Sequence, residues 1–236
     1  MYPYAVILPA AGSGSRMGAA VPKVLLPLPG EAIPERSVLR HSVDAFLRDS
    51  FCRCVVVCAP AEYLEQCKEQ ASSDSRVLVV EGGKTRQSSV FLGVAALRKI
   101  VSIESDMVTL VHDAARACVS AAVIERVIAA VVEHGAATAA VPIVDSVCRA
   151  SSEGNISEYV ERESLWSIQT PQGFRLGDLF NAHQQALERG FEGLDDASLL
   201  LSERKVVLVE GDRLNIKITR PEDLLVASMV CSARGN

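Results

Sequence analysis

The sequence predicts a three-layer α/β fold, in which a mostly parallel sheet lies between two layers of helices. Short β-rich runs alternate with longer amphipathic stretches along the first half of the chain. Near-continuous apolar strands separated by helices are typical of parallel strands that are buried on both faces. With 236 residues, of which 49% are hydrophobic and 22% charged, the chain can bury a sizeable core, so we expect residues 1–236 to form one domain.

The first half of the chain repeats strand and helix four times. The expected elements are a strand at 5–8, a helix at 38–47, a strand at 54–58, a helix at 61–71, a strand at 77–80, a helix at 88–100, a strand at 108–111 and a helix at 121–132. Right-handed crossovers between parallel strands place such helices on both faces of the sheet. Ligands are therefore expected at the carboxyl ends of the strands.

The pattern changes between about residues 145 and 163. This stretch is polar and charged, contains Gly154-Asn155, and has alternating apolar positions at Ile156 and Val160. It predicts an inserted β-hairpin that protrudes as an arm, with a surface loop as the alternative. Because a hairpin with little core of its own is marginal alone, we expect a second subunit to stabilise it, which makes the protein a homodimer through the arm.

Regular structure returns after the arm. We expect helices at 176–189 and 196–203, a strand at 206–209 and a last helix that begins at Pro221. Pro221 suits the first turn, where its missing N–H costs nothing. Thr219, with Glu222 three residues later, predicts a capping box at the start of this helix.

The composition limits the compartment and the partners. A net charge of −5 disfavours an electrostatic preference for nucleic acid or anionic lipid, so we expect neither a nucleic acid nor a membrane partner. The apolar start at 4–11 is too short for a signal peptide, and no apolar run reaches the roughly 18 to 20 residues that span a bilayer. A soluble, cytoplasmic protein is expected.

The cysteines indicate a reducing environment. There are seven, without a CxxC spacing, which favours free thiols over a disulfide framework or a zinc site. A period of two places Cys52, Cys54 and Cys58 on one face of a strand. We expect them to pack in the core.

A loop of small residues, Pro9 to Gly18, follows the first strand. Small side chains let backbone N–H groups approach phosphates or a base closely. A GxGxxG fingerprint would need glycine where Met17 stands, and no Gly-Lys pair completes the P-loop spacing. The remaining interpretation is a nucleotide loop in which Arg16 and Lys23 flank a triphosphate, with a generic flexible loop as the alternative.

Six stretches of the sequence resemble one family of enzymes. PAAGSGSRMG at 9–18, followed by Pro22-Lys23, looks like the loop of nucleotidyltransferases that join a nucleoside triphosphate to a phosphorylated polyol or sugar. The other stretches are GGKTRQSSV at 82–90, VHDAAR at 111–116, QTPQGF at 169–174, DDA at 195–197 and NIKITRPED at 215–223. Together they resemble the 2-C-methyl-D-erythritol 4-phosphate cytidylyltransferases of the non-mevalonate isoprenoid pathway.

This resemblance implies a Rossmann-like nucleotidyltransferase sheet and a reaction. The cytidylyl group of CTP would pass to 2-C-methyl-D-erythritol 4-phosphate, giving 4-diphosphocytidyl-2-C-methyl-D-erythritol and pyrophosphate. The residues implied to bind CTP are Pro9, Ala10, Ala11, Gly12, Gly14, Arg16, Lys23, Gly83, Lys84, Ser89 and Asp113, with Ser89 and backbone groups reading the cytosine edge. Those implied to bind the polyol phosphate are Asp113, Arg116, Ser146, Arg162, Thr170 and Lys217. Of these, Ser146 and Arg162 would reach from the arm into the neighbouring subunit's site.

The chemistry of such a transfer follows from the charges. A phosphate monoester is largely dianionic at pH 7, so it can attack the α-phosphorus of CTP without a general base. Charge then builds on the departing pyrophosphate, and the expected stabilisers are Arg16, Lys23 and a Mg²⁺ ion held mainly by the CTP phosphates. Lys217, on a strand before the last helix, is expected to hold the incoming phosphate. No metal site made by side chains is expected.

Several of these residues have structural alternatives. Asp113 follows an apolar strand and fits a helix N-cap as well as a substrate contact, and both can hold at once. Arg116 fits an anion contact or a surface ion pair. Arg86 fits a phosphate contact or hydrogen bonds that organise its loop. His112 is expected to be a packing residue, because the chemistry needs no base.

The sequence departs from the family's usual pattern at four positions. Ala117 stands in place of a proline, Lys84 of an acidic residue, Cys148 of a lysine and Leu194 of a threonine. The departures at Ala117, Cys148 and Leu194 motivate one alternative function, a catalytically weak nucleotide-binding protein. A ribitol 5-phosphate cytidylyltransferase with the same fold and chemistry is the other.

Overall fold

The computed structural model describes residues 2–11, 21–30, 36–71, 73–100 and 106–234. In this part of the chain, seven strands form the central sheet in the order β3-β2-β1-β4-β8-β5-β9. Their bounds are β1 (Tyr4–Pro9), β2 (Cys52–Ala59), β3 (Val77–Glu81), β4 (Val108–Val111), β5 (Ala136–Pro142), β8 (Trp166–Arg175) and β9 (Val207–Glu210). Strand β8 runs antiparallel to its neighbours β4 and β5, and the other pairs are parallel. The mostly parallel sheet predicted from the sequence is therefore confirmed.

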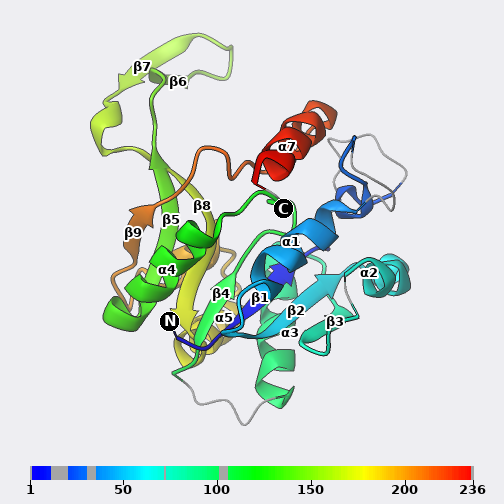
Figure 1. The fold of residues 1–236 in the computed structure, drawn as a ribbon. Helices are drawn as coiled ribbons and strands as arrows, with labels where there is room; N and C mark the ends of the chain where they lie inside the picture. The colour runs from blue at the N-terminus through cyan, green and yellow to red at the C-terminus, as the bar shows by residue number, and fades with distance from the viewer. Residues whose placement is uncertain (1, 12–20, 31–35, 72, 101–105, 235–236) are drawn as a thin grey trace.

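Two layers of helices cover the sheet (Figure 1). One layer contains α1 (Val38–Leu47), α2 (Leu64–Ala71) and α4 (Ala121–His134), and the other contains α3 (Arg86–Ile100), α5 (Leu176–Arg189) and α6 (Asp196–Leu200). The last helix, α7 (Pro221–Arg234), packs in a separate apolar cluster. Short 3₁₀ helices lie at Lys23–Leu25 (η2), Ala61–Tyr63 (η3) and Arg162–Ser164 (η4). Among the helices in the described ranges, none is long and apolar enough to cross a membrane.

The residues of β1 alternate between the two helical layers. Tyr4, Val6 and Leu8 pack with the layer of α1, α2 and α4, whereas Ala5 and Ile7 pack with the layer of α3 and α5. All five are fully buried. Because side chains leave a strand on both faces, a strand in the middle of three layers needs apolar residues at every position. This explains the continuous apolar run at the start of the sequence.

Two strands of the sheet, β5 and β8, were not among the predicted elements. Strand β5 is mostly alanine, which is depleted in strands, and β8 contains Pro171, which seldom occurs inside one, between the polar residues Gln169 and Gln172. Pro171 is accommodated because the pairing of β5 with β8 changes register between Thr138 and Ala140. Where the pairing is irregular, the sheet does not require a hydrogen bond from the N–H that proline lacks.

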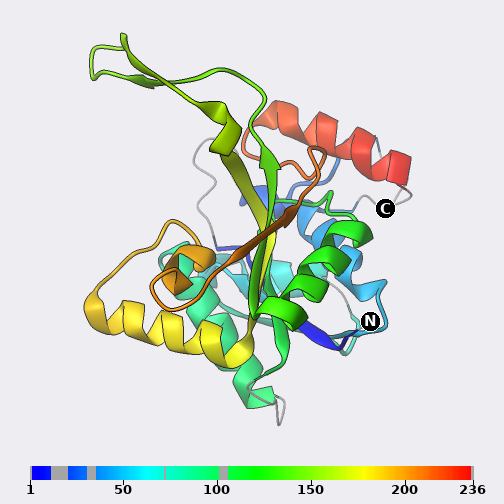
Figure 2. The same cartoon turned by 90° about the vertical axis from the view of Figure 1, so that its left-hand side faces the viewer.

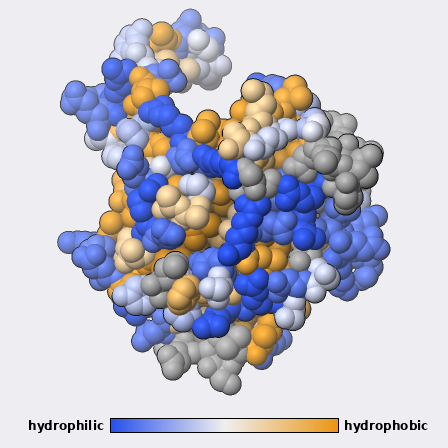
Figure 3. Space-filling view, in the orientation of Figure 1, coloured by the Kyte–Doolittle hydropathy of each residue, from blue (hydrophilic) through white to orange (hydrophobic). Residues whose placement is uncertain are grey.

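A separate antiparallel hairpin, β6 (Val147–Ala150) and β7 (Ile156–Val160), protrudes from the sheet (Figure 2). The prediction of a hairpin arm is confirmed. On the hairpin, Ile156 is 58% and Tyr159 71% exposed in the single chain, and Val144, just before the arm, is 52% exposed. Figure 3 shows hydrophobic atoms on the arm among hydrophilic ones.

Some predicted boundaries are wrong in detail. The helix expected at 61–71 begins as the 3₁₀ helix η3, and the helix expected at 196–203 ends at Leu200. The predicted capping box with Glu222 is also wrong. The carboxylate of Asp223 instead accepts hydrogen bonds from the N–H groups of Thr219 (2.7 Å) and Arg220 (2.8 Å), so one side chain satisfies two free donors at the helix start.

The cysteines of β2 do not all share a face. Cys52 packs with the layer of α1, whereas Cys54 and Cys58 pack with the layer of α3. The pairing of β1 with β2 shifts near the start of both strands, and the extra residue, Arg53, reverses the alternation. The prediction of one shared face is therefore wrong for Cys52. All three are buried free thiols, which confirms that they pack in the core.

Candidate active site

The carboxyl ends of β1, β3 and β4 meet on one side of the sheet, here called the carboxyl edge. Pro9, Ala10 and Ala11 lie at the end of β1, and Gly82 follows β3. The N–H groups of Ala10 and Gly82 donate to main-chain carbonyls of β2, at 2.9 and 2.7 Å. The N–H of His112, directly after β4, donates to a carbonyl of β1 at 2.9 Å. These bonds fix the strand ends from which the loops with the predicted nucleotide-binding residues begin.

Ser89 holds the loop that follows β3. Its buried hydroxyl accepts a hydrogen bond from the N–H of Gly83 (3.0 Å) and donates to the carbonyl of Thr85 (2.8 Å). An added Cβ on Gly83 would lie 2.2 Å from the Ser88 hydroxyl oxygen, so this tight loop requires glycine. The structure thus engages Ser89 in shaping the loop, and its contact with a base stays a prediction.

Asp113 lies at the centre of the carboxyl edge. Its Oδ1 accepts a hydrogen bond from Arg86 Nε (2.9 Å), and its Oδ2 lies 2.7 Å from Lys217 Nζ. Its main-chain N–H donates to the hydroxyl of Thr170 (3.0 Å). The N-cap alternative for Asp113 is wrong, because the next helix, α4, begins only at Ala121.

The segment at 211–220, between β9 and α7, brings Lys217 to this edge. It contains no strand, so the prediction that Lys217 lies on a strand is wrong: beside Lys217, the main chain at Ile218 bonds to the loop after β4. Ile218 donates its N–H to the carbonyl of Ala115 (2.9 Å) and accepts a hydrogen bond from Lys23 Nζ (2.7 Å). Lys23, Lys217 and the residues after β4 are thereby tied together.

Arg116 belongs to the same group. Its Nη1 donates to the carbonyl of Asn215 (2.6 Å). Its Nε is buried and has no hydrogen-bond partner within the described ranges. Burial lowers the pKa of Arg116, and Asp113 opposes that shift. Arg116 as a whole is half-buried, and a guanidinium at this edge is suited to an anion.

Arg86 connects Asp113 to a second buried carboxylate. Its Nη1 donates to Asp196 Oδ2 (2.7 Å), and the other oxygen of Asp196 lies 3.0 Å from His183 Nε2. The side chains of Asp196 and His183 are both 1% exposed. Arg86 therefore organises its surroundings by hydrogen bonds, which was one of its two predicted roles. Asp196 and His183 were not predicted as site residues; the Asp195-Asp196 motif was visible, but only the fold brings it to Arg86.

Both carboxylates remain ionised at neutral pH. Burial raises the pKa of Asp113, but Arg86 and Lys217 outweigh burial and hold it below its usual value. Burial also raises the pKa of Asp196, where Arg86 and His183 outweigh it. The cluster is therefore a row of alternating positive and negative side chains: Lys217, Asp113, Arg86 and Asp196.

His112 is a neutral packing residue. It is fully buried, and burial lowers its pKa from 6.5 to about 4. Its two ring nitrogens lie 3.1 Å from the hydroxyl of Thr170 and 3.0 Å from the carbonyl oxygen of Arg116. The expectation that it takes no part as a base agrees with this placement.

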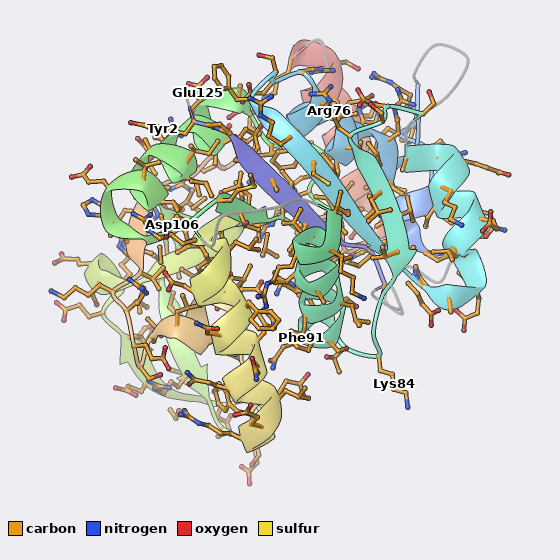
Figure 4. All side chains as sticks on the ribbon, turned by 90° about the horizontal axis from the view of Figure 1, so that it is seen from below. Tyr2, Arg76, Lys84, Phe91, Asp106 and Glu125 are labelled. Carbon is orange, nitrogen blue, oxygen red and sulfur yellow. The ribbon has the colours of Figure 1, made fainter. Side chains whose placement is uncertain are left out.

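The remaining predicted site residues either lie outside the described ranges or are exposed apart from this cluster. The predicted residues outside the described ranges are Gly12, Gly14 and Arg16. Lys84 is exposed, and its side chain points away from the body (Figure 4). Ser146 and Arg162 lie exposed on the arm, where Arg162 Nη1 donates to the carbonyl of Val144.

The departures from the family pattern fall in different surroundings. Ala117 is fully buried beside α7, so the loop after β4 is held by packing where a proline would stiffen it. Cys148 is exposed on the arm. Leu194, which is 99% exposed, precedes α6.

Comparison with known proteins identifies the family. The family model "IspD: 2-C-methyl-D-erythritol 4-phosphate cytidylyltransferase" matches residues 4–233. A 2-C-methyl-D-erythritol 4-phosphate cytidylyltransferase from Bacillus pumilus is 37% identical over 235 residues, which cover 98% of this chain and 97% of that protein. The one from Bacillus cereus is 39% identical over 228 residues, covering 95% and 96%.

Solved structures agree with this assignment. The crystal structure of the 2-C-methyl-D-erythritol 4-phosphate cytidylyltransferase from Francisella tularensis matches with a TM-score of 0.82 and 26% identity, over 97% of this chain and 99% of that one. The enzyme of the same name from Thermus thermophilus matches with a TM-score of 0.79 and 32% identity, over 98% and 100%. This chain belongs to the 2-C-methyl-D-erythritol 4-phosphate cytidylyltransferase family.

Proposed function

We propose that this protein transfers the cytidylyl group of CTP to 2-C-methyl-D-erythritol 4-phosphate, a step of isoprenoid precursor synthesis. The products are 4-diphosphocytidyl-2-C-methyl-D-erythritol and pyrophosphate. One observation carries the proposal: in a chain of this family, Lys217 and Arg116 gather around Asp113 at the carboxyl edge, with Lys23 tied to the same segment. Such a group of cations suits the binding of two phosphorylated substrates.

The reaction needs alignment more than proton transfer. An oxygen of the acceptor phosphate attacks the α-phosphorus of CTP, and the bond from that phosphorus to the bridging oxygen of the β-phosphate breaks. The electron pair leaves with pyrophosphate. Because the acceptor phosphate is largely dianionic at pH 7, no base has to remove a proton. His112 accordingly remains neutral and buried.

The cations divide between the two substrates. Lys217, whose side chain is 41% exposed, holds the acceptor phosphate from one side of Asp113. The guanidinium of Arg116, held by the carbonyl of Asn215, adds positive charge for the same anion. Thr170 supports this side indirectly, because its hydroxyl accepts from the N–H of Asp113. Lys23, together with Arg16, neutralises the triphosphate.

The nucleotide lies across the loops that follow β1 and β3. Pro9, Ala10 and Ala11 line it with Gly12 and Gly14 along the first loop. Gly83, Lys84 and Ser89 shape the second loop, whose main chain reads the cytosine edge. This assignment is supported by the small residues at both strand ends, which let main-chain groups approach a ligand closely.

A Mg²⁺ ion fits this site only as a companion of the triphosphate. Both oxygens of Asp113 already face cations, Arg86 and Lys217, and within the described ranges no three His, Cys, Asp or Glu side chains gather in a way that could hold a metal. When Mg²⁺ is bound, CTP phosphate oxygens would be its main ligands, as is common for Mg²⁺ at nucleotides. When bound, it would neutralise charge on the α-phosphoryl oxygens and the leaving pyrophosphate.

The active enzyme is a homodimer joined through the arm. The exposed apolar side chains of Val144, Ile156 and Tyr159 support this, because burial against a second subunit removes them from water. Ser146 and Arg162 then face the acceptor site of the partner. Light scattering at assay concentration is expected to give about twice the 25.3 kDa of one chain, and a mass near 25.3 kDa would contradict the dimer.

The enzyme acts in the cytoplasm. Cys52, Cys54, Cys58 and Cys67 are free thiols that are buried in the core. Buried thiols that form no disulfide suit a reducing compartment.

Pyrophosphate release tests the function. With CTP and Mg²⁺, we expect release with 2-C-methyl-D-erythritol 4-phosphate and none without an acceptor. Lys23→Ala is expected to lower the rate by about 10²- to 10³-fold, as for a lost stabiliser of transition-state charge. Faster release with ribitol 5-phosphate would reassign the acceptor, and CTP binding without release for any acceptor would identify a catalytically weak nucleotide-binding protein.

A further inference from the structure

Arg86 is shared between two buried carboxylates that come from distant parts of the chain. It lies at the start of α3, Asp113 follows β4, and Asp196 begins α6. The two hydrogen bonds, 2.9 and 2.7 Å, use different nitrogens of the planar guanidinium. The side chains of Asp113 and Asp196 are 11% and 1% exposed. A planar group held at two points has little freedom to turn.

Asp196 is itself held from three sides. Its second oxygen bonds to His183 of α5, whose ring stacks on Phe91 of α3 with centroids 6.1 Å apart. The main chain of α6 is anchored to β8, because Ala197 N–H donates to the side-chain oxygen of Gln172 (3.1 Å). Asp196 therefore offers Arg86 a fixed anchor, and Asp113 is the end of the chain of contacts that faces the site.

The fixed orientation of the Asp113 carboxylate also limits where the Lys217 ammonium group can lie. One oxygen of the carboxylate is occupied by Arg86, so only Oδ2 remains for the ammonium group, at 2.7 Å. Lys217 is 41% exposed and lies on a segment without regular structure. A long side chain in such a place has many rotamers, and a carboxylate of fixed orientation selects among them.

This arrangement is not explained by stability alone. Taking charges out of water costs several kcal/mol per ion, and buried ion pairs are often no more stabilising than apolar residues of similar size. Burial lowers the pKa of Arg86, but Asp196 and Asp113 outweigh burial and hold it above its usual value. The three side chains therefore stay charged, although their ion pairs stabilise the fold little more than apolar residues would. They are Asp113, Arg86 and Asp196.

We propose that Arg86 is a positioning residue for the cytidylyl transfer, which acts by fixing Asp113 between Asp196 and Lys217 so that the Lys217 ammonium meets the acceptor phosphate. The inference rests on the proposed function, because it takes Lys217 as the group that holds the acceptor. Arg86 itself need not touch either substrate. Asp196 and His183 form the anchor of this arrangement.

A double-mutant cycle between Arg86 and Lys217 tests the inference. Arg86→Lys keeps the charge, but one ammonium group cannot bond to both carboxylates in the same geometry. We expect kcat/KM for the acceptor to fall by about 10- to 100-fold, as for a misplaced catalytic group, while KM for CTP changes little. In a Lys217→Ala background, Arg86→Lys is expected to change kcat/KM less than about threefold, because residues that act as one unit are not additive.

The control is Arg76→Lys, an arginine at the opposite side of the sheet that also pairs with an aspartate, Asp74. It is expected to leave the kinetics unchanged. If Arg86→Lys fails to fold, Asp196→Asn keeps the shape of the anchor and removes its charge, and the same cycle with Lys217→Ala applies. Circular dichroism and thermal unfolding identify which variants fold.

Three results would overturn the inference. They are equal losses in both backgrounds, equal rises in KM for CTP and for the acceptor, and wild-type kinetics for Arg86→Lys. A wild-type enzyme that transfers nothing to the acceptor would overturn the proposed function as well. Wild-type activity together with an additive cycle would overturn only the role of Arg86.

Discussion

Two arginines at opposite sides of the sheet are equally exposed but bind different partners. The side chains of Arg86 and Arg76 are both 30% exposed. Arg76 lies at the amino edge, where the parallel strands begin, and pairs with Asp74, which is 31% exposed. Its Nη2 also donates to the carbonyl of Leu47 at the end of α1 (2.9 Å). Figure 4 shows Arg76 at the far side of the sheet from the loop of Lys84.

The difference lies in the partners of each arginine. Arg76 bonds to a carbonyl at the end of α1 and to the carboxylate of Asp74 on a surface loop, so water can replace much of this hydrogen bonding. Arg86 bonds to Asp113 and Asp196, whose side chains are 11% and 1% exposed, so water cannot replace it. Exposure of the arginine alone does not distinguish a structural clamp from a group that orders an active site. The burial of its partners does.

The largest expected effect is on stability, from Arg86→Ala. Removal of the guanidinium leaves Asp196 as a buried carboxylate without its main counter-charge, and such losses cost about 3 to 5 kcal/mol in the free energy of unfolding. Arg76→Ala is expected to cost much less, since exposed ion pairs contribute little. Unfolding in urea, followed by circular dichroism, measures both values. Equal losses for the two variants would show that the burial of the partner is not what separates these sites.

The two sides of the sheet should also differ in their response to acid. His112, at the carboxyl edge, has its pKa lowered by burial to about 4 from 6.5. Between these values the unfolded chain binds a proton that the folded protein does not, so stability falls as the pH drops through this window. The slope approaches about 1.4 kcal/mol per pH unit, and the loss by pH 4 reaches about 3 kcal/mol. The lowered pKa values of Asp113 and Asp196 add losses as the pH falls through the usual carboxylate range and below it, at the acid end of this window.

Urea unfolding at several pH values between 4 and 7 measures this slope. His112→Gln, which keeps hydrogen-bonding groups, is expected to flatten it. His134→Gln is the matched control, because that side chain lies 43% exposed at the end of α4, in water in both states. A slope that survives in His112→Gln would assign the acid sensitivity to other groups.

Much of the fold could be predicted because burial on both faces leaves a clear sequence pattern. The apolar runs of β1 to β4 and the helices between them have that pattern, and so does the change to polar residues in the arm. Strand β8 lacks this apolar pattern. The side chain of Gln169 donates to the carbonyl of Asp212 after β9, and that of Gln172 donates to the hydroxyl of Thr138 in β5. The reversed face of Cys52 depends on a register shift that no local pattern indicates.

Within the cluster around Asp113, the sequence indicated single residues but not the network. Asp113 and Arg116 follow an apolar run predicted to be a strand, and Lys217 belongs to a stretch that resembles the family. Nothing in the sequence spacing places Asp196 and His183, from α6 and α5, beside Arg86. Such contacts form between elements that are far apart in the chain, so only the packed structure shows them.

The smallest expected effect separates the two sides by their glycines. Gly135, at the amino edge, ends α4 with φ of 87°, and an added Cβ would meet no atom closer than 3.6 Å. Gly135→Ala is therefore expected to cost about 1 kcal/mol in the free energy of unfolding, from backbone strain alone, and to leave the kinetics unchanged. Gly83 has an ordinary backbone, but its added Cβ would lie 2.2 Å from Ser88 Oγ and 3.0 Å from the Ser88 carbonyl carbon.

Gly83→Ala must therefore displace the start of α3 or the loop itself. A displacement of the loop weakens the approach of its main chain to the base, so we expect KM for CTP to rise by about tenfold, equivalent to about 1.4 kcal/mol, with little change in KM for the acceptor. Steady-state kinetics in which each substrate is varied separately measures both constants. A rise confined to the acceptor would move the loop of Gly83 from the nucleotide to the polyol phosphate, whereas unchanged kinetics would mean that the carboxyl edge tolerates crowding as well as the amino edge does. The comparison thus separates Gly135, where backbone strain lowers only the free energy of unfolding, from Gly83, where crowding raises KM for CTP.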